Sequence, residues 1–134
     1  MSHNQVILLL GTNLGDKNLN LQTAQELIGS KIGEITRMSE IIETEPVGFD
    51  SENNFLNQTL WISTEFSPMK LLTEIKLIEN DMGRIYTRNR AEGKYEDRII
   101  DIDILIFNSI NFESKTLKLP HNQIFSRNFV KKLL

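Results

Sequence analysis

Two aspartates stand two residues apart in the strongly apolar segment RIIDIDILIF, residues 98–107. With the two-residue period of a β-strand, Asp101 and Asp103 share one face with Leu105 and Phe107, and four isoleucines form the other. β-Branched residues predominate, which favours a strand. The carboxylates would lie roughly 7 Å apart and would repel each other unless a positive group lay near them. The pattern leaves two interpretations open, a solvated strand end and a divalent-cation site.

Basic residues gather directly before this strand. Four of the six arginines lie within fifteen residues: Arg84, Arg88, Arg90 and Arg98. With Lys94 they belong to a stretch, residues 84–97, that has no regular period and is long for a connection in a compact domain. Scattered charge on a solvated loop is the simpler interpretation of this stretch alone. Beside two carboxylates, however, such cations suit a polyphosphate bound through Mg²⁺, which prefers oxygen ligands and takes some of them from phosphates.

Two further motifs suggest phosphate contacts. His121 follows a proline and stands six residues before Arg127, so it is either a phosphate donor or a structural histidine of a loop. GTNLGD, residues 11–16, has neither the Lys-Ser/Thr of a phosphate-binding loop nor the third glycine of a dinucleotide fingerprint. We interpret it as a tight turn from a strand into a helix, with Asp16 or Asn18 near the helix N-terminus.

A second type of site is suggested by ETEPVGF, residues 43–49, and FLNQ, residues 55–58. Phe55 and Asn57 share a strand face, so an aromatic ring lies beside an amide that can both donate and accept hydrogen bonds. Thr44, Val47 and Gly48 would approach them if the preceding loop folds over the strand. This combination fits a flat heterocycle with a mixed hydrogen-bonding edge, and core packing is the alternative for Phe55.

The composition sets outer limits. The chain has 134 residues, 40% of them hydrophobic and 25% charged, as in an ordinary soluble domain. The absence of cysteine excludes disulfides, thiol catalysis and thiolate metal sites. With a net charge of -3, the chain does not have the overall basic charge of a protein that coats nucleic acid. Without a membrane-length apolar run or a signal-peptide pattern, we expect one cytoplasmic domain.

Elements that could position these residues follow from periodicity. The sequence predicts a buried strand at residues 5–10, a helix from about residue 17 that ends at Gly29 or Gly33, and one strand over residues 34–44. A strand over residues 55–66 precedes a helix that begins at Ser67-Pro68 and ends at Gly83. The strand with both aspartates and a hairpin at residues 110–119 complete the chain. The order β-α-β-β-α-β predicts an α+β, ferredoxin-like split-βαβ fold, with an antiparallel sheet and both helices on one face.

Six segments together resemble one enzyme family. They are LLLGTNLGD, ETEPVGF, FLN, IEND-GR, RIIDIDILIF and LPH-----RNF, and they span residues 6–129. In this order they are similar to 6-hydroxymethyl-7,8-dihydropterin pyrophosphokinase (2-amino-4-hydroxy-6-hydroxymethyldihydropteridine diphosphokinase), which acts in folate synthesis. The resemblance implies a single pyrophosphokinase domain over residues 1–134. It also implies transfer of pyrophosphate from ATP to the pterin hydroxymethyl oxygen with release of AMP, assisted by two Mg²⁺ ions.

The resemblance further implies roles for residues of this chain. Asp101 and Asp103 match the metal ligands. The positions that match catalytic residues are these two aspartates together with Arg84, Lys94 and Arg98. The positions that match ATP-binding residues are Glu79, Arg84, Arg98, Ile104, His121 and Arg127. The positions that match pterin-binding residues are Thr44, Glu45, Val47, Phe55, Asn57, Tyr95 and Phe129. The expected partners are ATP and the hydroxymethyl pterin, without nucleic acid or membrane, and the expected state is a monomer.

Two other functions remain alternatives. A ferredoxin-like nucleic-acid-binding module would need exposed aromatic residues with flanking basic residues on its sheet face. The acidic net charge and the aspartate pair argue against it. A nucleotide-binding regulator without turnover would keep the site but lose catalytic groups, and the presence of Arg98, Asp101 and Asp103 argues against that.

Overall fold

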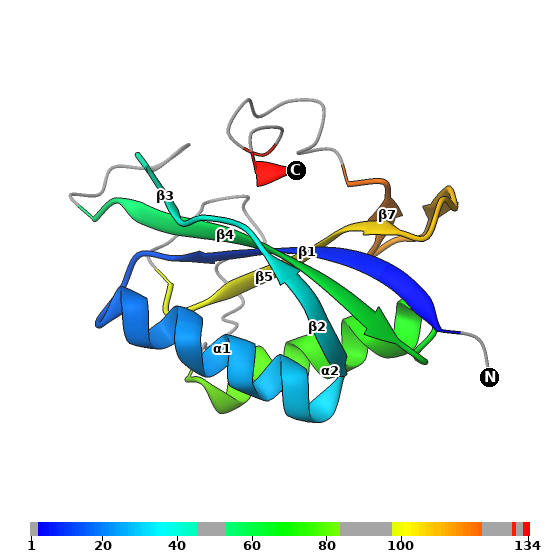
Figure 1. Cartoon of the computed structure of the whole chain (residues 1–134), viewed down its shortest axis with the longest axis horizontal. Coiled ribbons are helices and arrows are strands. Elements are labelled where there is room, and N and C mark those ends of the chain that lie inside the picture. The colour runs from blue at the N-terminus through cyan, green and yellow to red at the C-terminus, as the bar shows by residue number, and fades with distance from the viewer. Residues whose placement is uncertain (1–2, 46–52, 84–97, 122–129, 131–132) are drawn as a thin grey trace.

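A five-stranded antiparallel sheet with two helices on one face forms the body of the protein (Figure 1). The computed structural model describes residues 3–45, 53–83, 98–121, 130 and 133–134. The elements follow in the order β1 (Asn4–Thr12), α1 (Lys17–Lys31), β2 (Gly33–Met38), β3 (Ile42–Thr44), β4 (Phe55–Thr64), α2 (Pro68–Asp81), β5 (Asp101–Phe107), β6 (Phe112–Glu113) and β7 (Lys118–Leu119).

The strand order confirms the predicted fold. The sheet runs β2-β4-β1-β5, with β3 also paired to β4, and the pairings are antiparallel. When β2 and β3 are taken together as the second strand, this is the order of a ferredoxin-like sheet. The predicted hairpin is also confirmed, because β6 and β7 pair as a separate two-stranded sheet.

The main core lies between the sheet and the helices. Side chains from one face of β1, β4 and β5 pack against α1 and α2. The largest fully buried side chains of this core include Leu8, Leu10, Leu60 and Ile62 from the strands and Leu21, Ile28, Leu71 and Ile75 from the helices. A smaller apolar cluster lies on the opposite face, where Leu9 and Leu105 pack with Val130 and Leu133. The helices therefore cover one face of the sheet, and Val130 and Leu133 cover part of the other face.

Local signals set the helix ends. The Asp16 side chain accepts a hydrogen bond from the Leu19 amide and caps α1, and Ser67 caps α2 in front of Pro68. Gly83 follows α2 with a φ of +98°, a conformation that glycine adopts without strain. Of the two glycines predicted to mark the end of α1, Gly29 lies inside the helix, which ends at Lys31, whereas Gly33 directly follows the C-cap residue Ile32, so the Gly33 alternative is confirmed.

Two strand predictions needed correction. Residues 34–44 do not form one strand, because the chain leaves the ladder after Met38 and β3 rejoins β4 further along. In β5 the register against β1 shifts between Ile7 and Leu8, whose partners are Ile106 and Ile104. An extra residue in one strand turns the following side chains to the other face. Ile106 therefore joins the smaller cluster with Leu105, and Phe107 joins the main core.

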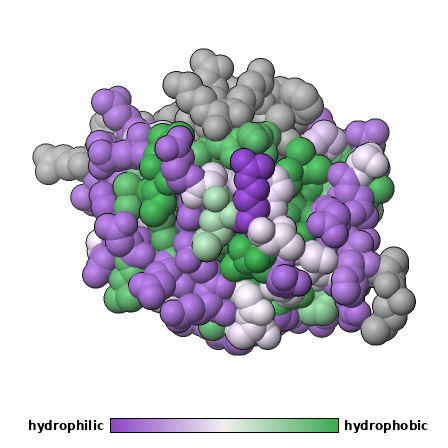
Figure 2. All heavy atoms as spheres, in the orientation of Figure 1, coloured by the Kyte–Doolittle hydropathy of each residue, from purple (hydrophilic) through white to green (hydrophobic). Residues whose placement is uncertain are grey.

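The surface has mixed polarity. On the face shown in Figure 2, hydrophobic side chains form separate patches between hydrophilic ones. Among the helices that the structure describes, none combines the length and the apolar character required to cross a membrane.

Candidate active site

Residues of the two predicted half-sites form one row across the sheet. Asn57 of β4 pairs with Gly11 of β1, and Gly11 pairs on its other side with Asp101 of β5. Directly opposed residues of antiparallel strands point their side chains to the same face. Phe55 and Asp103, two residues away along their strands, share this face, which is the one without helices. The sheet register therefore brings the heterocycle motif and the carboxylate motif together.

Arg98 lies between these two motifs. Its Nη1 is 3.1 Å from Oδ2 of Asp101, and its guanidinium carbon is 5.8 Å from the centre of the Phe55 ring. The side chain of Arg98 is only 9% exposed and that of Asp101 24%. Two neighbouring carboxylates repel each other unless a positive group lies near them. Arg98, three residues before Asp101, provides that positive group.

His121 approaches the same carboxylate from the segment after β7. Its backbone N–H donates to the carbonyl of Leu105 at 2.8 Å, which fixes this segment against β5. Burial lowers the pKa of His121 below its usual value, and the charge of Asp101 offsets only part of that effect. The imidazole is therefore neutral at pH 7 in the ligand-free protein and can donate one N–H to a phosphate oxygen.

Asn57 is 4% exposed and is held firmly from the neighbouring strand. Its Nδ2 donates to the carbonyl of Ile42 at 3.1 Å and to Oγ1 of Thr44 at 2.8 Å. These two hydrogen bonds occupy the side-chain NH₂ group of Asn57, and its side-chain oxygen, Oδ1, lies on the side of Gly11. A Cβ on Gly11 would be 3.5 Å from that oxygen and 3.7 Å from Cδ1 of Phe55. Glycine therefore leaves space between the amide and the ring, where a flat ligand could approach the backbone.

Glu79 and Ile104 have contacts that bear on their predicted ATP-binding roles. Glu79 is 3% exposed, and its Oε2 accepts a hydrogen bond at 2.9 Å from the amide of Ile102, the residue between the two aspartates. Its carboxylate therefore helps to hold β5. The side chain of Ile104 is 2% exposed in the main core, so only its backbone could face a nucleotide.

Of the other predicted residues, Thr44 supports Asn57 as described, and Glu45 is exposed beside it. Seven predicted site residues lie outside the described part of the chain: Val47, Gly48, Arg84, Lys94, Tyr95, Arg127 and Phe129. Arg88 and Arg90 lie outside it as well.

Sequence reasoning missed Gly11 and Asn13, which it placed in a merely structural turn. Asn13 is 1% exposed and is hydrogen-bonded both to Asn53 and to Arg98. The available signal was the Gly-Thr-Asn that directly follows a buried strand, but nothing local shows that this turn meets segments 40 and 85 residues away.

The donor set suits an ion that shares its ligands with a substrate. Within the described residues, no group of three or more His, Cys, Asp or Glu side chains is arranged to hold a metal. Two carboxylates on one strand offer oxygen donors, which Mg²⁺ prefers, and Mg²⁺ commonly takes its remaining ligands from water and phosphates. Asp101 and Asp103 therefore fit Mg²⁺ bound together with a nucleotide.

Comparisons with known proteins show the family of the chain. The sequence profile of the family described as 7,8-dihydro-6-hydroxymethylpterin-pyrophosphokinase (HPPK) matches residues 7–134. A 2-amino-4-hydroxy-6-hydroxymethyldihydropteridine pyrophosphokinase of Porphyromonas gingivalis is 39% identical over 94% of this chain and 85% of its own length. A mitochondrial folate synthesis bifunctional protein of Pisum sativum is 35% identical over 94% of this chain and 24% of its own length.

A solved structure shares the fold. The chain aligns with the HPPK-DHPS of Plasmodium falciparum, crystallised with pteroate, at a TM-score of 0.69 and 22% identity. The alignment covers 93% of this chain and a third of that protein (33%). The profile match over nearly the whole sequence and the 39% identity to the Porphyromonas gingivalis enzyme assign the family: the chain belongs to the 7,8-dihydro-6-hydroxymethylpterin-pyrophosphokinase family.

Proposed function

We propose that this protein transfers the pyrophosphoryl group of ATP to the hydroxymethyl oxygen of 6-hydroxymethyl-7,8-dihydropterin, in folate biosynthesis. The observation that carries the proposal is the row Asn57–Gly11–Asp101, with Arg98 between the carboxylate and the ring of Phe55. Family membership and the names of the relatives support the same activity. In this reaction the pterin oxygen forms a bond to the β-phosphorus, the bond from that phosphorus to the α–β bridging oxygen breaks, and AMP leaves.

The described residues can supply both positioning and charge. The nearly buried guanidinium of Arg98 is suited to bind phosphate oxygens, and its contact with Asp101 fixes its position. The neutral imidazole of His121 can donate a hydrogen bond to the same phosphates without adding a charge. Such a transfer depends mainly on alignment and charge stabilisation and needs no protein nucleophile.

Asp101 and Asp103 would hold Mg²⁺, which supplies charge neutralisation at the transferred group and at the leaving oxygen. Their place on β5 keeps both carboxylates on one face, and Glu79 fixes the intervening amide of Ile102. Strand geometry and a buried hydrogen bond thus keep the two ligands at a set spacing.

The pterin would lie against Phe55, with its polar edge at the Oδ1 of Asn57 above Gly11. Thr44 and the carbonyl of Ile42 hold the amide in one orientation, so that its oxygen is presented as an acceptor. A pre-oriented acceptor favours an N–H edge of the heterocycle and loses little entropy when the ligand binds.

Phosphorus NMR of a completed reaction tests this proposal. The purified protein is incubated with ATP, Mg²⁺ and the hydroxymethyl pterin, and the expected products are AMP and a pterin with two coupled phosphorus signals. Parallel samples omit the pterin or contain the Asp103→Asn variant, and both should form little AMP. Formation of ADP and a pterin monophosphate would contradict the proposal.

The nucleic-acid-binding alternative finds less support on the sheet face. One aromatic residue with a basic neighbour is present on this face, because the guanidinium of Arg37 lies 4.4 Å from the centre of the Trp61 ring. Asp101 and Asp103 lie on the same face, however, and Phe55 is next to a guanidinium already paired with Asp101. Like charges would repel a nucleic-acid backbone at this position.

A further inference from the structure

Asn13, in the turn after β1, connects two segments that are remote from it in sequence. Its Nδ2 donates to the carbonyl oxygen of Asn53 at 3.2 Å, and its Oδ1 accepts the backbone N–H of Arg98 at 2.7 Å. The backbone N–H of Asn13 also donates to the carbonyl oxygen of Arg98 at 3.1 Å. Because Asn13 is only 1% exposed, its hydrogen bonds are shielded from competing water.

The two connected segments carry different halves of the proposed site. Asn53 stands two residues before Phe55 and four before Asn57, which face the proposed pterin position. Arg98 places its guanidinium against Asp101, on the side of the proposed nucleotide. Asn13 is thus bonded at once to the start of the pterin segment and to the start of the segment that binds phosphate and metal.

The local tasks of the turn are performed by other residues. Asn20 donates from Nδ2 to Oγ1 of Thr12 at 3.1 Å and to the carbonyl of Leu14 at 2.8 Å, and Asp16 caps α1. The side chain of Asn13, by contrast, forms hydrogen bonds with residues 40 and 85 positions away.

We propose that Asn13 is a positioning residue that keeps the nucleotide half and the pterin half of the site in one register, an inference that rests on the proposed function. Group transfer between two bound substrates depends steeply on their alignment, and a displacement of about 1 Å can reduce the rate on the order of 100-fold. Loss of the Asn13 side chain should therefore reduce transfer more than it reduces the binding of either substrate alone.

Three variants test this role. Asn13→Ala removes both long-range side-chain hydrogen bonds. Asn13→Asp keeps an acceptor for the Arg98 amide but replaces the donor to the Asn53 carbonyl. Asn20→Ala is the matched control, because it removes two hydrogen bonds of the same kind from the same turn without affecting either half-site.

We expect Asn13→Ala to lower kcat at saturating ATP and pterin by at least about 10-fold. The Kd of a Mg²⁺–ATP analogue and that of the pterin, each measured alone by calorimetry, should change less than kcat does. Asn13→Asp should raise the KM for the pterin more than the KM for ATP, because only the link to Asn53 is lost. Asn20→Ala should lower the melting temperature and keep the wild-type kcat.

Hydrogen exchange without ligands separates this inference from the proposed function. In Asn13→Ala, peptides that cover residues 98–103 and 53–57 should both exchange faster than in the wild type and in Asn20→Ala. In Asn13→Asp, only the peptide over residues 53–57 should do so. Unchanged exchange in both peptides, or equal kcat values in Asn13→Ala and Asn20→Ala, would overturn the inference. A wild-type protein that makes no AMP would instead overturn the proposed function, and the exchange data would still decide whether Asn13 joins the two segments.

Discussion

At the scale of single residues, Arg98 links the chemistry of the two half-sites. Its guanidinium contacts Asp101 and approaches the ring of Phe55, while its backbone amide is bound by Asn13. A positive charge that is nearly buried beside a carboxylate both holds that carboxylate in place and compensates its charge. Substitution of Asp101 should consequently affect stability as well as turnover.

Asp101→Asn and Asp103→Asn should each reduce turnover by about 1,000-fold or more, since each would remove charge that holds Mg²⁺ and organises the transferred group in the proposed reaction. Repulsion between two carboxylates predicts unchanged or higher stability without metal. The contact with Arg98 reverses this for Asp101→Asn, which should lose about 1–2 kcal/mol of unfolding free energy. Urea unfolding in EDTA and a turnover assay measure the two effects. Near-normal turnover in either variant would refute the metal assignment.

Thr44→Val should weaken pterin binding about 10-fold, because it removes an acceptor that orients the amide of Asn57 and replaces it with a side chain of similar shape. Asn57→Leu should weaken it further. Both variants should bind a Mg²⁺–ATP analogue like the wild type, as measured by calorimetry on each ligand separately. Thr36→Val is the control, since Thr36 is exposed and donates to the carbonyl of Trp61. An equal loss for both ligands would show that the pterin has been placed wrongly.

His121 should make the ligand-free protein less stable in mild acid. Because burial lowers its pKa, the folded state takes up a proton less readily than the unfolded chain does. Unfolding free energy contributed in this way is present above the usual histidine pKa of about 6.5 and is lost as the pH falls toward the lowered value. In EDTA, the stability of His121→Asn should therefore fall less than that of the wild type between about pH 7.5 and 5.5. Identical pH dependence in urea unfolding would contradict this explanation.

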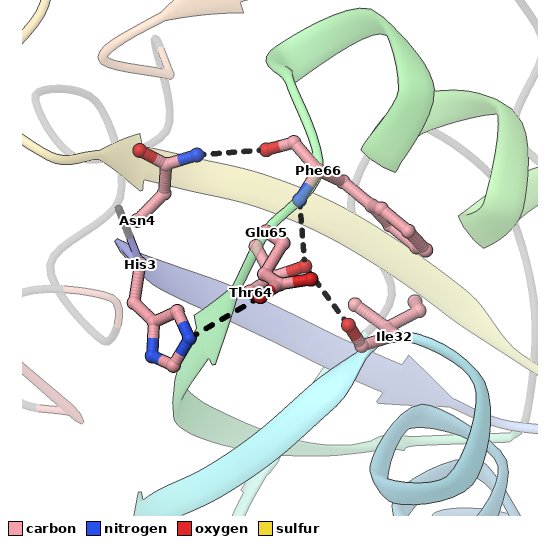
Figure 3. A network of polar contacts seen from close by, with 6 residues as sticks. All are labelled: His3, Asn4, Ile32, Thr64, Glu65 and Phe66. Atoms are coloured by element: carbon pink, nitrogen blue, oxygen red, sulfur yellow. Dashed lines mark hydrogen bonds and ion pairs between the residues drawn. The ribbon is translucent and has the colours of Figure 1, made fainter. Parts of the chain in front are cut away.

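At the scale of elements, the end of the sheet farthest from the site is fastened by side chains between strands (Figure 3). The hydroxyl of Thr64, at the end of β4, donates to the carbonyl of Ile32 and accepts from the amide of Phe66, and Asn4 donates to the Phe66 carbonyl. His3 and Glu65 pair across the same end at 3.5 Å. These contacts join the start of β1, the end of α1 and the end of β4.

Gly33→Ala should disrupt this end of the sheet. Gly33 begins β2 opposite Thr64, and a Cβ there would lie 2.1 Å from the carbonyl oxygen of Ser63, so the strands would have to separate. We expect a loss of roughly 2 kcal/mol or more in unfolding free energy, as for other overpacked sites. Gly29→Ala is the matched control inside α1. Apart from the backbone of α1 itself and the two chain neighbours, no atom of the described residues lies within 4 Å of its added Cβ, and helix propensity should raise stability by about 0.5–1 kcal/mol. Equal effects in urea unfolding would contradict the close approach.

At the scale of the whole molecule, the fold separates stability from the site. The main core lies between the sheet and the two helices, whereas the proposed substrate and metal groups lie on the opposite face (Figure 1). The ferredoxin-like frame by itself says little about chemistry, because many functions use it. Its contribution here is to place the ends of β1, β4 and β5 side by side.

Removal of Mg²⁺ should therefore abolish turnover without unfolding the protein. With excess EDTA, AMP formation should stop, and the melting temperature of the ligand-free protein should remain within a few degrees of its value in Mg²⁺, since the apolar core does not depend on the ion. Return of Mg²⁺ should restore turnover. A cooperative loss of structure in EDTA, seen by circular dichroism, would contradict this separation.

The sequence alone determined the features that depend on local pattern. Ser67-Pro68 marked the start of α2, Asp16 was one of two residues expected near the start of α1, alternation predicted the strand over residues 55–66, and the element order predicted the ferredoxin-like fold. These features follow from capping and periodicity, which need only neighbouring residues. The family resemblance added the expected reaction, and the profile match confirms the family.

Only the tertiary structure decided which distant residues meet. The bulge that turns Ile106 and Phe107 each to the face opposite to the predicted one, the break between β2 and β3, and the hydrogen bonds of Asn13 to Asn53 and Arg98 depend on the register of strands far apart in the chain. Period-two alternation defines which face a residue occupies only until a register shift occurs. A buried amide in a turn likewise acquires its role from the segments packed against it, and for that reason the sequence placed Asn13 in an ordinary turn.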